Sequence, residues 1–137
     1  MKGKKTLTFL LMDAPFENER TISALRLIDI AARRGHAITV FAYEGAVGLA
    51  FAKQAAHANS VHGRDADGED HPLPRLWVEG LIRTAAAHGG HLDWVNCGLC
   101  VDERGVAEAV AGVRRGSPAD LLKAAEQSDN TLVIGAR

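Results

Sequence analysis

The sequence has no excess of charge of one sign and no long apolar run. Lys plus Arg number 16 and Asp plus Glu number 17 in 137 residues, which gives a net charge of −1. This balance argues against a basic nucleic-acid surface and against a polybasic membrane anchor. No apolar stretch reaches the roughly 18 residues that a membrane-spanning helix requires. We therefore expect neither nucleic acid nor a membrane among the partners of this protein.

Cysteine is scarce, since the chain holds only Cys97 and Cys100. Two cysteines are too few for the disulfide framework of a small secreted domain. Three lysines near the start precede the apolar run Leu7–Met12, but this run is short and meets Asp13 at once. It indicates a buried strand and not an export signal, because no small-residue cleavage pattern follows. We expect a cytoplasmic protein whose two thiols are reactive, metal-binding or inert.

Several familiar motifs are also missing. No Gly-x-Gly-x-x-Gly follows the first apolar run, and there is no Walker A sequence and no Gly-x-Ser-x-Gly elbow. The acidic segment Asp65–Asp70 lacks the spacing of an EF-hand loop. Nucleotide binding, serine-hydrolase chemistry and EF-hand calcium binding therefore have no motif support, and we expect no cofactor and no metal.

Short apolar runs alternate with helical patterns along the chain. Apolar, β-branched runs predict strands, and apolar residues spaced three or four apart predict helices. The predicted strands are Thr6–Met12, Ala37–Tyr43, His91–Asn96 and Thr131–Ile134, and the predicted helices are Thr21–Arg34, Gly45–His57, Arg75–His88 and a helix from the cap Ser117 to about Gln127. Alternation of this kind predicts parallel βαβ units in a three-layer α/β fold. We expect one domain over residues 1–137.

Two further features concern the surfaces of the predicted elements. The inner faces of the first and third helices are expected to carry Ile22, Leu25, Ile28 and Ala32, and Leu76, Trp77, Leu81 and Ala85. The stretch Asn59–Pro74 is rich in charge, glycine and proline and has little to bury. We interpret it as an exposed polar loop, inserted between the second and third helices.

Candidate site residues follow two of the predicted strands. Ligands of open parallel sheets gather beyond the carboxyl ends of the strands. The segment Asp13–Arg20 follows the first strand and Cys97–Gly105 follows the third, so both loops are expected at one edge of the sheet. Glu19, in the first of these loops, is a candidate supporting acid.

Cys97 is the candidate nucleophile. If a helical turn begins directly after it, backbone N–H groups would face the sulfur and stabilise a thiolate, which is the form that attacks disulfide or persulfide sulfur. Arg104 would add positive charge, whereas Asp102 and Glu103 would oppose the thiolate. The Cys-x-x-Cys spacing lets Cys100 reach the same sulfur, to resolve a persulfide or to close a disulfide.

Other interpretations of this pair remain open. Free cysteines are often buried and inert. One Cys-x-x-Cys supplies only two of the four ligands that structural zinc normally takes, so a histidine or an oligomer partner would have to complete a zinc site. A thioredoxin-like redox motif follows the first strand of a βαβ unit, whereas this pair follows the third predicted strand.

The residues around the pair also carry a family resemblance. Val95–Val106 joins Cys-x-x-Cys to Asp-x-Arg-Gly, and this stretch resembles the DsrE/DsrF-like family, especially its YchN-like branch, which is related to sulfur-relay proteins. Further segments resemble the same family: Gly112–Ser117, Ser128-Asp129 with the strand after it, Ala14-Pro15-Phe16 with Glu19, and Ala24–Leu27.

The resemblance implies a three-layer α/β/α domain with a mainly parallel sheet of about five strands. The fifth strand would lie within Ala107–Arg114, which the residue pattern leaves unassigned. The resemblance also implies a homo-oligomer, trimer or hexamer.

In the sulfur-relay members of this family, a cysteine holds sulfur as a persulfide between a protein donor and a protein acceptor. Counting back from Arg104-Gly105, that cysteine corresponds to Cys97, while Cys100 matches only the Cys-x-x-Cys branch. The protein is thus expected to be a sulfur carrier, sulfurtransferase-like if it is active. The alternative is a noncatalytic oligomeric binding or scaffold protein whose cysteines are inert or bind metal.

Overall fold

A computed structural model describes residues 3–58, 61, 63–65 and 73–135 of the chain. The first half contains β1 (Thr6–Leu11), α1 (Glu19–Arg33), β2 (Ala37–Ala42), the short 3-10 helix η1 (Glu44–Ala50) and α2 (Pro74–Ala87). The second half contains β3 (His91–Cys97), α3 (Gly98–Arg104), β4 (Val113–Gly116), α4 (Pro118–Gln127) and β5 (Asn130–Ile134).

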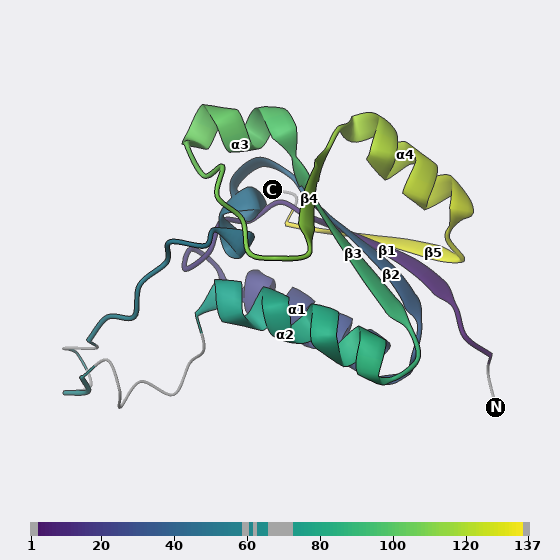
Figure 1. The fold of residues 1–137 in the computed structure, drawn as a ribbon, viewed down its shortest axis with the longest axis horizontal. Helices are drawn as coiled ribbons and strands as arrows, with labels where there is room; N and C mark the ends of the chain where they lie inside the picture. The colour runs from purple at the N-terminus through teal and green to yellow at the C-terminus, as the bar shows by residue number, and fades with distance from the viewer. Residues whose placement is uncertain (1–2, 59–60, 62, 66–72, 136–137) are drawn as a thin grey trace.

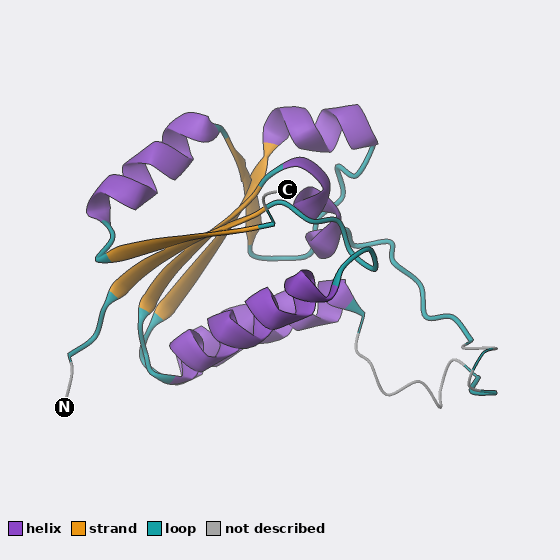
Figure 2. Cartoon of the chain, turned by 180° about the vertical axis from the view of Figure 1, so that it is seen from behind, coloured by secondary structure: helices purple, strands orange, loops and turns teal. Residues whose placement is uncertain are grey.

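The five strands form one sheet in the order β4-β3-β2-β1-β5, and every neighbouring pair is parallel. Figure 1 shows α1 and α2 on one face of this sheet and α3 and α4 on the other, and Figure 2 shows the same layers from behind. The prediction of a three-layer α/β/α domain with a parallel sheet of about five strands is confirmed. The strand that the residue pattern left unassigned is β4 (Val113–Gly116). It overlaps only the end of Ala107–Arg114, the segment expected to hold it.

The core lies between the sheet and its helices. The three central strands are covered on both faces, which is why they are rich in apolar residues, and Trp94, Phe41 and Ile38 are among the largest buried side chains. The inner face of α1 carries Ala24, Leu25, Ile28 and Ala32.

Ile22 and Leu76 were expected in the core, but both are exposed. The inward stripe of α1 begins at Thr21, so Ile22 is turned about 100° away from it. In α2 the buried residues are Pro74, Val78, Leu81 and Ala85, and Leu76 lies two positions from both Pro74 and Val78, on the far side of the helix.

The predicted helix Gly45–His57 is wrong in most of its length. Only the 3-10 helix η1 forms, and the residues from 51 to 58 are not helical. The chain there pairs with the segment before β4: Ala52 N–H donates to the Glu108 carbonyl at 2.8 Å, and Val110 N–H donates to the Ala50 carbonyl at 2.9 Å. These long-range hydrogen bonds satisfy backbone groups that a continuing helix would have satisfied locally.

Two further expectations concern the polar stretch between the second and third predicted helices and the membrane-spanning segments. Most of the polar stretch Asn59–Pro74 lies outside the described residues, so its prediction as an exposed loop stays a prediction. Within the described residues, the helices include none with the length and apolar character needed to cross a membrane.

Candidate functional site

Cys97 lies at a junction of two elements on the carboxyl edge of the sheet. It is the last residue of β3 and the N-cap of α3, and in the sheet register it pairs with Gly116 of β4. The predicted helical turn after Cys97 is therefore present. The sulfur makes no capping hydrogen bond to the backbone of α3, because the side chain is packed into the interior instead.

Cys100 is the third residue of α3. Side chains at the N-cap and at the third helical position face each other, as they do in a capping box, and the Cys100 thiol accordingly hydrogen-bonds to Cys97. The backbone N–H of Glu44 donates to the Cys100 sulfur at 3.2 Å. Glu44 has a left-handed φ of 50°, which is uncommon for a residue with a side chain and marks a constrained turn at this edge.

Burial controls the protonation of Cys100. It raises the pKa of the Cys100 thiol to about 11, and the hydrogen bond to Cys97 acts in the same direction. The Glu44 amide lowers the pKa but does not outweigh burial. At neutral pH Cys100 is therefore a protonated thiol, suited to donate a hydrogen bond to the sulfur of Cys97.

Both sulfurs are covered in the single chain. Cys97 is 2% exposed and Cys100 is 6% exposed, whereas Leu99 between them is 73% exposed. The first turn of α3 thus presents an apolar side chain to the surroundings and keeps the two thiols inside. A reaction at Cys97 therefore requires a local change of structure that exposes its sulfur.

The charged residues predicted around the cysteines have separate partners. The Arg104 guanidinium lies 3.4 Å from the Cys100 carbonyl oxygen and 3.5 Å from the Glu103 carboxylate. Asp102 forms two hydrogen bonds with Arg115, at 2.9 and 3.0 Å, and this contact lowers the pKa of Asp102. The negative charge of Asp102 is therefore matched by a cation.

Arg115 is a residue of this site that the sequence did not identify. Besides holding Asp102, it donates to the carbonyl oxygen of Gly98, the residue after Cys97, at 3.1 Å. It comes from β4, and its proximity follows from the pairing of β4 with β3. The sequence signal was a pair of arginines before a helix cap, which gives no indication of their partners.

The first loop lies at the same edge of the sheet, as predicted. It packs against η1: a Cβ added to Gly45 would lie 2.8 Å from the Ala14 side chain, and one added to Gly48 would lie 3.2 Å from Pro15. Glu19 is exposed at the start of α1. Among the described residues no hydrogen bond or ion pair joins Glu19 to a cysteine, so its supporting role stays a prediction.

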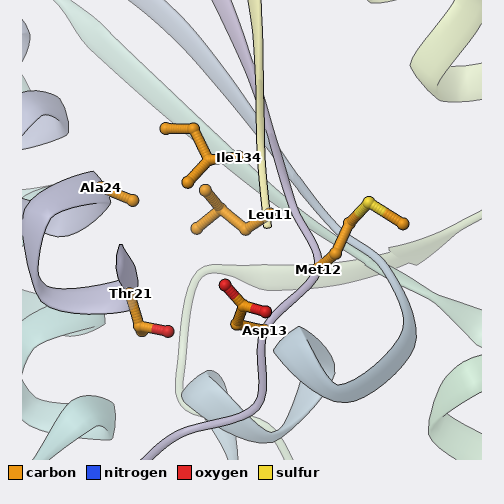
Figure 3. A pocket seen from close by; sticks show the side chains of 6 residues that line it. All are labelled: Leu11, Met12, Asp13, Thr21, Ala24 and Ile134. Carbon is orange, nitrogen blue, oxygen red and sulfur yellow. The ribbon is translucent and has the colours of Figure 1, made fainter. Parts of the chain in front are cut away.

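A small hollow lies near the β1–β5 side of this edge, lined by Leu11, Met12, Asp13, Thr21, Ala24 and Ile134 (Figure 3). It is too narrow to hold a water molecule. Thr21 places a buried hydroxyl there with no hydrogen-bond partner, and the Asp13 carboxylate is paired with Arg20. None of the residues that line the hollow is a cysteine, so the hollow does not give a substrate access to either thiol.

No group of three histidine, cysteine or acidic residues that could hold a metal ion occurs within the described part of the chain. The two cysteines therefore lack the further protein ligands that a structural zinc site would need from the described residues. A zinc site completed by a residue of another subunit stays one of the alternatives for the two cysteines.

Comparison with known proteins places the chain in a structural class. The model of the DsrE/DsrF-like family matches residues 5–134. The crystal structure of the ychN protein from E. coli is similar, with a TM-score of 0.74 over 94% of this chain and 98% of that one. The sequences are 17% identical, so this likeness shows a shared fold. No curated protein matches the chain.

Proposed function

The chain belongs to the DsrE/DsrF-like family, and on that basis we propose that it carries sulfur as a persulfide on Cys97, between a protein donor and a protein acceptor. The observation that carries this proposal is the arrangement of two cysteines at the first turn of α3, one ending a strand and the other protonated beside it. In this role the protein is sulfurtransferase-like.

Loading and unloading are thiol exchanges that need no external oxidant. The Cys97 thiolate attacks the outer sulfur of a donor persulfide, forming Cys97–S–SH, and the donor leaves as its thiolate. An acceptor thiolate then attacks the outer sulfur of Cys97–S–SH, and the Cys97 thiolate leaves. In both steps the Cys100 thiol stabilises the anionic sulfur by donating its proton in a hydrogen bond.

Cys100 provides a second route by which the outer sulfur can leave the Cys97 persulfide. Its sulfur attacks the inner sulfur of Cys97–S–SH, a Cys97–Cys100 disulfide forms, and the outer sulfur leaves as hydrogen sulfide. The Cys100 sulfur is oxidised, the outer sulfur is reduced and the Cys97 sulfur keeps its oxidation state, so the electrons balance. This step requires the Cys100 thiolate, and because burial raises the pKa of Cys100 to about 11, transfer to a protein acceptor is favoured over release as sulfide at neutral pH.

Sulfur uptake tests the proposal directly. Incubation of the protein with a persulfide donor should add one sulfur atom to the wild type, measured by intact mass. Cys97→Ser should abolish the addition, whereas Cys100→Ser serves as the matched control and should still take up sulfur. Uptake by Cys97→Ser equal to that of the wild type would show that the assignment of Cys97 is wrong.

The burial of both sulfurs favours a second candidate, a noncatalytic oligomeric binding or scaffold protein with inert cysteines. Alkylation of the native and the urea-unfolded protein separates the two functions. An inert Cys97 would react only after unfolding, at the rate of an ordinary thiol. A carrier cysteine would react in the native protein, because the first turn of α3 opens.

A further inference from the structure

Arg115 contacts α3 at two places. Its Nη2 donates to the Gly98 carbonyl oxygen at 3.1 Å and to Asp102 Oδ2 at 2.9 Å, and its Nη1 donates to Asp102 Oδ1 at 3.0 Å. The guanidinium also lies close to the chain at Gly98, since a Cβ at that position would be 3.1 Å from Nη2. One side chain from β4 thus holds the residue that follows Cys97 and the residue one turn later.

This contact is better suited to fixing the turn than to stabilising the fold. Arg115 and Asp102 are both exposed, and exposed ion pairs contribute little to stability. The guanidinium is a rigid planar donor, so three hydrogen bonds to two residues define the position of the first turn closely. Arg115 also interacts electrostatically with Cys97, which contributes to raising the pKa of Arg115 after the larger effect of Asp102.

An anionic sulfur at Cys97 needs such a partner. Burial of an unpaired anion is costly, and Cys97 is almost completely covered. The charged and titratable groups on the elements around Cys97 are Cys100, Asp102, Glu103 and Arg104 of α3, Glu44 of η1, Tyr43 beyond the end of β2, His91 and Asp93 of β3, Arg114 and Arg115 of β4, and Asp120 of α4, whose carboxylate lies beside Gly116. Of the three arginines, Arg104 is directed at the Cys100 carbonyl and Arg114 is paired with Asp93 and Asp120, which leaves Arg115 as the cation that interacts with Cys97.

We propose that Arg115 is the positioning residue of Cys97: it fixes the turn that carries the sulfur and supplies the positive charge that stabilises this sulfur as a thiolate or a persulfide anion. The importance of Arg115 for sulfur transfer rests on the proposed function. Its charge effect on the ionisation of Cys97 is measurable whether or not the protein carries sulfur.

The neighbouring Arg114 provides a matched control. Its guanidinium lies 3.0 Å from Asp93 and 3.6 Å from Asp120, so it is held by other partners. Arg114→Gln removes the same charge one residue away and leaves the contacts to Gly98 and Asp102 in place. Arg115→Lys keeps the charge but loses the planar set of donors.

The test is the pH profile of Cys97 alkylation by iodoacetamide, located by peptide mass spectrometry. Arg115→Gln should move the midpoint of the profile to higher pH by about one unit, because the thiolate loses its counter-charge. Loss of the contacts to Gly98 and Asp102 also loosens the turn and raises the rate at every pH, so the midpoint and not the rate at one pH is compared. Arg115→Lys should give a smaller displacement, and Arg114→Gln should match the wild type.

A purely structural role would give a different result. Loosening of the turn would speed alkylation at every pH without displacing the profile. That outcome, an equal displacement in Arg114→Gln, or a Cys97 that stays unreactive in every variant would each overturn the proposal.

Sulfur uptake by the same variants separates this proposal from the proposed function. A displaced profile in Arg115→Gln together with no sulfur uptake by the wild type would leave the role of Arg115 standing and remove the carrier function. Normal uptake with an undisplaced profile would remove only the role of Arg115.

Discussion

Cys97 and Cys100 are three residues apart and have different surroundings. Cys97 ends a strand and has the Arg115 cation acting on it, whereas Cys100 lies beneath the Glu44 amide with its pKa raised to about 11 by burial. These surroundings favour an attacking sulfur at Cys97 and a proton-donating thiol at Cys100. We therefore expect two residues of the same type to differ in reactivity because their surroundings differ.

The raised pKa of Cys100 predicts a pH dependence of stability. The folded state binds the thiol proton more tightly than the unfolded chain, so this stabilisation is present below the ordinary thiol value of 9.0 and is lost as the pH rises toward about 11. Urea unfolding at several pH values between 8 and 11 should show a steeper loss of stability for the wild type than for Cys100→Ala. Curves that stay parallel over this range would contradict the prediction.

Sequence reasoning located some of these residues and missed others for physical reasons. Cys97 was predictable because an apolar strand ends at it. Arg115 was not, because its contacts depend on the register between two strands that are separated in the chain, the first ending at Cys97 and the second beginning at Val113. Burial of the cysteines was one of the interpretations that the sequence left open. The contact of Cys100 with Glu44 was not predictable, since it depends on η1, a segment whose structure was predicted incorrectly.

The 3-10 helix η1 packs against α3 and contacts the site through its first residue. Its first residue, Glu44, donates the N–H that reaches Cys100, and its glycines lie against the loop after β1. The side chains of Ala14 and Pro15 occupy the space that a Cβ at Gly45 or Gly48 would need. The first loop, η1 and α3 are therefore linked by direct contacts, although Glu19 itself lies outside this chain of contacts.

Two glycine substitutions test this packing. Gly45→Ala would place a Cβ 2.8 Å from Ala14 Cβ and 3.1 Å from its backbone nitrogen, so it should destabilise the protein. Gly80→Ala, inside α2, would meet only Arg83 at 4.0 Å, and it should stabilise the protein by up to about 1 kcal/mol, because alanine is the better helix former. Urea unfolding measures both. Equal stability of the two variants would show that the first loop yields freely to η1.

At the scale of elements, the sequence predicted the apolar strands to within one residue at each end. The polar strand β4 escaped because it has four residues, two of them arginine, and is a strand only through its pairing with β3. The helix expected at Gly45–His57 failed because the backbone from 50 to 52 pairs with the segment from 108 to 110. Local periodicity carries no information about either partner.

At the scale of the whole molecule, burial is uneven. The core of β2 and β3 is covered on both faces, but α4 has no buried residue, and Leu122 and Val133 are exposed on α4 and β5. Parallel sheets are usually covered on both faces. The incomplete cover of the β5 edge agrees with the prediction of a homo-oligomer, which stays a prediction for this chain.

Light scattering coupled to size-exclusion chromatography measures the assembly. We expect the mass of a trimer or a hexamer of the 14.6 kDa chain, maintained on dilution through the micromolar range. A monomer at all concentrations would contradict the oligomer and would weaken the sulfur-relay proposal, since that proposal takes its assembly from the same family.

Because α3 begins directly after β3, the structure has a consequence for how a sulfur atom held on Cys97 would be protected. Cys97 ends the strand and Gly98 begins the helix, so no flexible tether lies between them. We expect exposure of the thiol to displace the first turn of α3 together with its exposed Leu99. Small reductants in solution would consequently reach a stored sulfur atom only during such openings, whereas a partner whose surface displaces the turn would reach it directly.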